Sequence, residues 1–337
     1  MNDTSPALPK RVIMADVARV ASVHKSTVSL ALRNDPSIPA HTRTRIQAIA
    51  RQLDYRPDPV LDAFNRHRLG RTTRSGYPLA FVSNLGSREE FERSHRHKAT
   101  FAAARAAAEA HGCSLECFLV GPRQLSIQRL AQILRARGIA ALILGLPDSA
   151  QAPVDLDWSR FCAIAIESPH PQPPLDTLSG NYREASKLAI ERLATSGCRR
   201  PGISLDSRFG TPILHQLRAG YLFECHHLRL PCIDSHDCSA KGESLDAWAI
   251  RQSVDGIVFA GSTPRPCLVG KKRMPLPRAA IAVVEIDGTY PALPGVAAPH
   301  ALLGQHAVER LMLHLHANLS GLPTLPATTL MPIVWRD

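Results

Sequence analysis

Long apolar runs are absent from this 337-residue sequence, in which no window approaches the roughly 18–20 apolar residues that a membrane-spanning helix needs. An apolar leader is absent as well, because residues 1–10 are polar and contain two prolines. These absences argue against a membrane anchor and against an export signal. We therefore expect a cytoplasmic protein that does not interact with membranes.

Cysteine is missing before Cys113, and all eight cysteines lie from that position onward. In the cytoplasm they are expected to be reduced thiols rather than a disulfide framework. The stretch 225–238 combines three cysteines with three histidines: Cys225, His226, His227, Cys232, His236 and Cys238. This stretch lacks the Cys-x-x-Cys spacing of structural zinc sites, so we interpret it as a surface connection and expect neither metal nor cofactor.

Glutamate is missing from the segment 1–76, where thirteen Lys or Arg face six Asp and leave a charge of +7. The segment 77–337 contributes only +4 to the total of +11. Such a concentration of positive charge indicates a polyanionic partner. The sequence also shows neither a nucleophile–base–acid set nor a phosphate-binding glycine loop. We therefore expect a protein that is not an enzyme.

Hydrophobic residues make up 45% of the chain, which is enough for packed cores and excludes a disordered or fibrous protein. Helical periodicity in residues 13–56 predicts three helices at 13–21, 25–33 and 40–53, the layout of a helix-turn-helix module. Beyond residue 77, apolar runs alternate with helical stretches, which predicts parallel sheets covered by helices on both faces, in two lobes. The strands are expected at 79–82, 114–120, 140–144, 161–166, 201–205, 256–259 and 280–285, and the helices at 99–111, 127–137, 183–195, 212–226 and 300–318.

Residues 16–34 read DVARVASVHKSTVSLALRN, followed by TRTRI at 42–46 and LDYRPDP at 53–59. These motifs resemble the DNA-binding headpiece of the LacI/GalR family of bacterial transcriptional regulators. The later chain is similar to the family's periplasmic-binding-protein-like effector domain more loosely, for instance in GCRRPGI at 197–203. The resemblance implies an all-α helix-turn-helix headpiece at 1–56, a hinge or linker at 57–76, and an α/β effector-binding and dimerisation domain at 77–337.

The second helix has the side chains that a recognition helix needs at its N-terminal end. Lys25, Ser26 and Ser29 are short polar or basic groups for base edges, and the resemblance makes Lys25 and Ser26 the main base readers. Contacts to phosphates or flanking groups are expected from Thr27, Arg33 and Asn34. The resemblance adds Tyr55 to the DNA-binding residues. The family's usual Gly is Ser22 here and its usual Ser or Thr is His24, so we expect Ser22 to cap this helix.

In the hinge, the resemblance implies a helix that forms on DNA and inserts apolar side chains into the minor groove. Phe64 occupies the matching position, and apolar insertion is what kinks a duplex. A flexible linker, with Phe64 packed against its own domain, is the alternative. Asp58 stands where the family usually has Asn.

Effector contacts are expected at three residues. The resemblance places Asp287 where relatives hydrogen-bond a sugar or purine, although Asp287 could also cap a turn. Asn84 follows the first strand at the edge of the expected cleft. Leu217 stands where an Arg commonly clamps the ligand, and Arg218 is shifted by one position.

The sequence thus predicts a DNA-binding transcriptional regulator, most simply a repressor, that binds double-stranded operator DNA as a homodimer. Its operator affinity is expected to change when a small-molecule effector (a sugar, nucleobase or related metabolite) binds. A two-lobed solute-binding protein would share the larger domain but would have no use for residues 13–64. An activator remains an alternative within the same class.

Overall fold

The structure, a computed structural model, describes residues 12, 14–32, 35, 37–53, 55, 77–147, 153–168, 173–240, 243–261, 281–286, 294–317 and 319–336. The chain divides into two compact units, residues 1–71 and 72–337. The expected hinge at 57–76, with Asp58 and Phe64, lies outside the described residues, as do Arg33, Asn34 and Asp287.

The first unit contains three short helices, α1 (Met14–Ala21), α2 (Lys25–Leu32) and α3 (Ala40–Gln52), where the sequence predicts them. Apolar side chains at helical spacing meet in one small core, whose buried members are Val17, Ala18, Ala21, Val28, Ala31, Ile46 and Ala50. Each helix is too short to be stable alone, so this shared core holds the unit together.

A tight turn joins α1 to α2. Ser22 adopts a left-handed backbone with φ of 53°, and the amide of Val23 donates to the carbonyl of Ala18 (3.0 Å), which ends α1. The expectation that Ser22 caps α2 is wrong, because Ser22 is the left-handed turn residue. His24 takes the capping position, where its Nδ1 accepts from the amide of Ser26 (3.3 Å).

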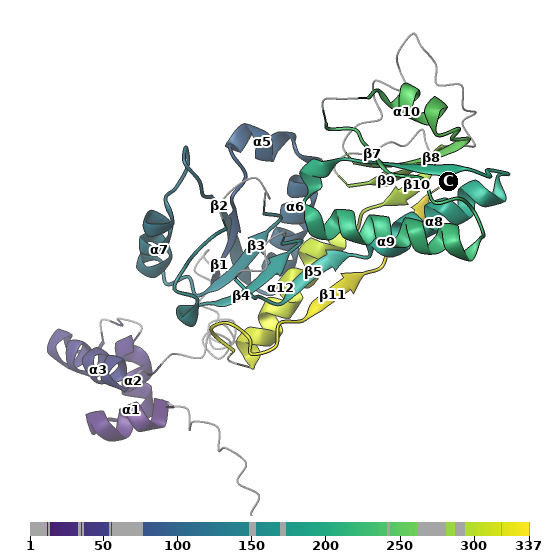
Figure 1. Ribbon diagram of the computed structural model, residues 1–337. Helices are drawn as coiled ribbons and strands as arrows, with labels where there is room; N and C mark the ends of the chain where they lie inside the picture. Colours follow the sequence, from purple (N-terminus) through teal and green to yellow (C-terminus); the bar gives the residue numbers. More distant parts are fainter. Residues whose placement is uncertain are drawn as a thin grey trace, which may run out of the picture. The chain divides into compact units, whose positions relative to one another are not determined.

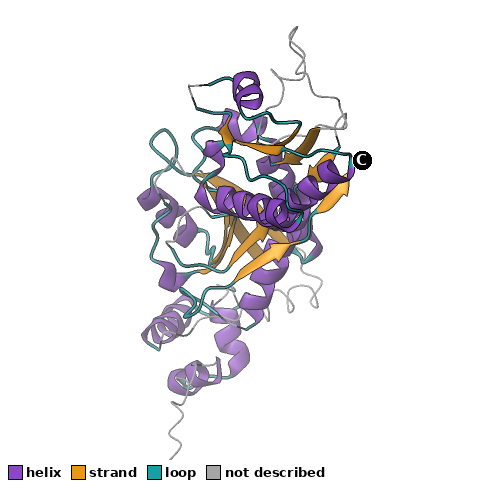
Figure 2. Cartoon of the chain, turned by 45° about the vertical axis from the view of Figure 1, so that its right-hand side comes forward, coloured by secondary structure: helices purple, strands orange, loops and turns teal. Residues whose placement is uncertain are grey.

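The second unit consists of two lobes, each built on a six-stranded sheet with helices on both faces (Figures 1 and 2). The first lobe has an all-parallel sheet in the order β11-β5-β4-β3-β1-β2. Its strands are β1 (Tyr77–Ser83), β2 (Cys113–Leu119), β3 (Ala141–Gly145), β4 (Cys162–Ile166), β5 (Thr177–Gly180) and β11 (Thr328–Met331). Its helices are α5 (Arg88–Arg93), α6 (His95–Ala110), α7 (Ile127–Ala136) and α12 (His300–His316).

The second lobe has the order β12-β10-β9-β8-β6-β7, parallel except for β12. Its strands are β6 (Pro201–Leu205), β7 (His236–Asp237), β8 (Gly256–Gly261), β9 (Ile281–Glu285), β10 (Gly295–Ala297) and β12 (Val334–Arg336). Its helices are α8 (Tyr182–Thr195), α9 (Thr211–His227) and α10 (Leu245–Arg251). The expected α/β architecture of two lobes is confirmed.

Successive side chains of β1 point to opposite faces of the sheet, and helices cover both faces. Ala80 and Val82 pack with Leu130 and Leu134 of α7, whereas Phe81 meets Phe101 of α6 edge-on at 5.3 Å between ring centroids. A strand that is covered on both sides reads as a continuous apolar run, which is why these strands were predictable.

The chain passes between the lobes three times, from β5 to α8, from β10 to α12 and from β11 to β12. The first and third passages are bonded to each other, because the amide of Asn181 donates to the carbonyl of Met331 (3.0 Å). Paired passages of this kind leave the lobes connected by a narrow bridge. They also bring the carboxyl ends of the strands in both lobes toward one cleft.

Candidate functional site

The recognition-helix residues lie at the start of α2. Lys25 and Ser26 are exposed, whereas Val28 and Ala31 point into the core. Thr27 and Ser29 are half-buried. One charged and one polar side chain are therefore accessible on the first turn of the helix, which is where a helix that enters a major groove presents its base contacts.

His24 belongs to the same surface at the start of α2. Its Nδ1 lies 2.9 Å from the hydroxyl of Ser26, so the ring and the expected base reader form one unit. Tyr55 packs half-buried against the headpiece core, and its amide donates to the carbonyl of Ala50 (2.8 Å). Its ring thus contributes to packing, and its DNA contact stays a prediction.

A second candidate site lies in the cleft between the lobes, at the carboxyl ends of β3 and β4. Leu146 and Glu167, the residues that follow these two strands, both have left-handed backbones, with φ of 48° and 49°. Left-handed non-glycine residues cost free energy and concentrate at binding sites. Two of them on neighbouring strands mark this edge of the sheet.

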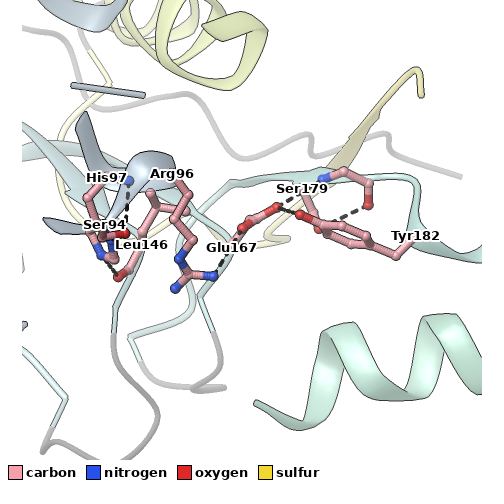
Figure 3. A network of polar contacts seen from close by, with 8 residues as sticks. Ser94, Arg96, His97, Leu146, Glu167, Ser179 and Tyr182 are labelled. Carbon is pink, nitrogen blue, oxygen red and sulfur yellow. Dashed lines mark hydrogen bonds and ion pairs between the residues drawn. The ribbon is translucent and has the colours of Figure 1, made fainter. Parts of the chain in front are cut away.

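Glu167 is the centre of a buried polar network (Figure 3). Its Oε1 accepts from the hydroxyl of Tyr182 at 2.6 Å and from the amide of Gly180 at 3.4 Å. Its Oε2 lies 3.9 Å from Nη1 of Arg96, at ion-pair distance. Complete burial, reinforced by the negative charge of Glu167, raises the pKa of Tyr182 well above its usual value. Tyr182 is therefore a permanent donor that holds the carboxylate in place.

Arg96 connects the two lobes. Its guanidinium approaches Glu167 in the first lobe and lies over the ring of Phe209, in the short helix η2 (Ser207–Phe209) of the second, at 5.5 Å. A partly desolvated cation over an aromatic face is attractive. Next to Arg96, His97 has one ring nitrogen 2.7 Å from the hydroxyl of Ser94 and the other 3.1 Å from the carbonyl of Leu146 (Figure 3).

A cavity of about 360 Å³ opens beside this network, with walls from both lobes. Its polar groups include Glu167, Ser179 and Gln216, and its apolar groups include Phe209 and Ile213. A concave site with a few polar groups among apolar walls is the usual form of a small-molecule site. The cavity is thus the candidate effector site.

Asn84 is buried directly after β1, at the edge of the cleft that the sequence predicts for it. Arg218 is exposed on α9, where Leu217 is the buried neighbour. Neither residue is among the described residues that line the cavity. Their effector contacts stay predictions.

Sequence reasoning missed Glu167, Arg96, Tyr182 and Phe209. Glu167 had a readable signal, because an ionisable residue that follows a buried strand directly is placed at the cleft, by the reasoning used for Asn84. Arg96 had none, since it lies in the first turn of a helix and meets Glu167 only in the folded lobe.

The described residues include no group of three or more His, Cys, Asp or Glu side chains arranged to hold a metal ion. Within the same ranges, no helix is both long and apolar enough to cross a membrane.

Residues 13–58 match the family model described as bacterial regulatory proteins, lacI family. The HTH-type transcriptional regulator PtxS of Pseudomonas plecoglossicida is 38% identical over 85 residues, or 25% of this chain and 24% of PtxS. The probable HTH-type transcriptional repressor ExuR of Bacillus subtilis (strain 168) is 45% identical over 47 residues, or 14% of each chain. The headpiece is therefore of the LacI type, and the similarity in sequence to these regulators lies in that part of the chain. The matched segments span a quarter or less of these curated relatives.

Solved structures extend the likeness in fold to almost the whole chain. A transcriptional regulator CelR–cellobiose complex matches with a TM-score of 0.58 and 15% identity, covering 97% of this chain and 99% of that one. A lac repressor dimer bound to operator and the anti-inducer ONPF matches with a TM-score of 0.53 and 19% identity, covering 97% and 98%. The expected fold class, a helical headpiece with a two-lobed periplasmic-binding-protein-like domain, is confirmed.

Proposed function

We propose that the protein is a sequence-specific DNA-binding transcriptional regulator, a repressor in its simplest form, that binds double-stranded operator DNA as a homodimer. The observation that carries this proposal is the LacI-type headpiece, in which Lys25 and Ser26 stand exposed on the first turn of α2. Similarity to the transcriptional regulators PtxS and ExuR and to the operator-bound lac repressor supports it. The division at 1–56, 57–76 and 77–337, and the wedge role of Phe64, belong to the same proposal.

The interlobe cavity is proposed to bind a small-molecule effector, a sugar, nucleobase or related metabolite, that changes operator affinity. Its walls come from both lobes, so a bound ligand has differential contacts with the open and closed arrangements. The cellobiose complex of CelR supports a ligand in this fold. We propose no catalytic activity for the protein. Because its proposed partner is DNA, we also propose a cytoplasmic, nucleoid-associated location.

A two-lobed solute-binding protein without a regulatory role is the alternative function. It leaves the headpiece without a purpose, and the headpiece is the part of the chain with the strongest family match. DNA binding therefore decides between the two.

Selection of bound DNA from a random pool, with and without a mixture of sugars and nucleobases, tests the proposal. We expect enrichment of a pseudo-palindromic site and a change in its affinity when the cognate compound is present. The Glu167→Gln variant keeps the volume of the side chain but removes its charge beside Arg96. It is expected to bind the same DNA site and to lose the ligand response. Failure to enrich any site would contradict the proposal, and an affinity that no compound changes would contradict its effector half.

A further inference from the structure

Two cysteines lie near the end of α9. Cys225, in the last turns of the helix, is fully buried. Cys232 is exposed, in the loop that leads from α9 toward β7. This is the cysteine and histidine stretch that the proposed function leaves unused.

Hydrogen bonds hold that loop against the helix on both sides of Cys232. The amide of Leu230 donates to the carbonyl of Cys225 at 2.8 Å. The hydroxyl of Tyr221, one turn before Cys225, accepts from the amide of Ile233 at 2.9 Å and donates to the carbonyl of Pro201 at 3.0 Å. The loop residues between these anchors, Cys232 among them, therefore run alongside the 221–225 turn, which brings Cys232 close to Cys225.

The two thiols differ in reactivity. Burial, and next the nearby Cys232, raise the pKa of Cys225 to about 12, so Cys225 stays protonated at neutral pH. Cys232 is the thiol that a dissolved oxidant reaches. A third thiol, Cys198, is buried and donates to Oδ1 of Asp255 at 2.8 Å, which directs it to another partner.

We propose that Cys232 and Cys225 form a peroxide-sensitive dithiol, in which hydrogen peroxide or an organic hydroperoxide is the oxidant. Cys232 attacks the peroxide oxygen as its thiolate, forming a sulfenic acid and releasing water or an alcohol. The sulfur of Cys225 then attacks the sulfenic sulfur while the thiol proton leaves with the sulfenic hydroxyl, giving the 225–232 disulfide and one water. Two thiols lose two electrons and two protons, and the peroxide O–O bond is reduced.

Cys238 provides a matched control within the same lobe. It is also exposed, but its amide donates to the carbonyl of Leu205 at 2.9 Å, at the carboxyl end of β6. The contact between Tyr221 and Pro201 places the proposed pair at the opposite, amino end of that strand. Cys232 and Cys238 are thus both exposed, but only Cys232 lies near Cys225.

The test treats the reduced full-length chain with one to ten equivalents of hydrogen peroxide, blocks remaining thiols by alkylation, and maps tryptic peptides by mass. Cys225 falls in peptide 219–229, and both Cys232 and Cys238 fall in peptide 230–241. We expect these two peptides to become linked in the wild type and in Cys238→Ser. In Cys232→Ser we expect at least tenfold less of the linked pair.

Linked peptides in Cys232→Ser at the wild-type level, or their absence from the oxidised Cys238→Ser chain, would overturn the proposal. Because the wild type and Cys238→Ser keep both proposed thiols, the result does not depend on whether a variant at the buried Cys225 folds. No DNA enters the assay, so its outcome is independent of the proposed regulatory function.

Discussion

Single residues with left-handed backbones mark both candidate sites. Ser22 makes the turn that sets α2 against α1, and Leu146 and Glu167 end the two strands that border the cleft. A left-handed non-glycine residue costs about 1–2 kcal/mol, which surrounding structure must offset. At Glu167 the offset is visible, because Tyr182 and Gly180 donate to its carboxylate.

Replacing Ser22 by glycine should stabilise the headpiece. Relief of the left-handed cost exceeds the extra chain entropy of glycine, about 0.5–1 kcal/mol, so the net gain is about 0.5–1 kcal/mol. Hydrogen exchange of the Val23 amide, which is bonded to the carbonyl of Ala18, should slow by roughly two- to fivefold.

Ser253→Gly is the matched control, since Ser253 has φ of 51° in the other unit. It should leave the exchange of Val23 unchanged. Faster exchange in Ser22→Gly would show that the serine side chain, and not its backbone, secures the turn.

At the scale of elements, each lobe packs one pair of helices through a glycine. A Cβ on Gly220 of α9 would stand 2.0 Å from the carbonyl oxygen of Arg183 in α8. A Cβ on Gly304 of α12 would stand 2.1 Å from the carbonyl oxygen of Thr100 in α6. Backbone cannot give way as a flexible side chain can, so these two glycines fix how closely the helices approach.

Gly220→Ala should therefore push α8 and α9 apart and lower the free energy of unfolding by about 1–3 kcal/mol, the usual cost of overpacking. Urea unfolding followed by circular dichroism measures it. His226→Ala, at an exposed position on the same helix, should change stability by no more than about 0.5 kcal/mol. Equal stability of Gly220→Ala and wild type would contradict the close approach.

The long elements were predictable from sequence because their apolar pattern is local. The strands around Ala80, Ile143 and Ile203 are fully buried runs, and each appears within a few residues of its expected place. The helix expected at 99–111 begins earlier, at His95, because the Ser94 hydroxyl accepts from the amide of His97 (3.4 Å) and starts it.

The missed elements are short and depend on distant partners. β10 and β12 are three-residue strands, and Val296 pairs with Trp335, from which α12 and β11 separate it in the chain. Such short strands carry no periodic signal. The contacts in the cleft are equally hard to predict from sequence. Glu167 follows a predictable strand, whereas its contact with Arg96 exists only after β1, β4 and α6 have assembled.

At the scale of the whole molecule, the charge of +11 is unevenly shared, with +7 in the segment 1–76. In the described headpiece, Lys25, Arg45 and Arg51 are exposed, whereas Arg43 donates to the carbonyl of Asp35 (3.0 Å). Cations that neutralise DNA phosphates release counterions from the DNA, so binding becomes weaker as salt rises. The charge is therefore interpreted as a local contact surface for phosphates.

The affinity of the full-length protein for its selected DNA site, measured from about 50 mM to about 200 mM salt, tests this most directly. The logarithm of the affinity should fall linearly with that of the salt concentration, by at least about tenfold across this range. Lys25→Ala should weaken specific binding by about tenfold or more, the cost of a lost base contact, whereas Lys98→Ala, exposed on α6, should match the wild type. An affinity that is nearly independent of salt, or a Lys25→Ala variant that binds like the wild type, would contradict the central claim that the headpiece reads DNA through α2.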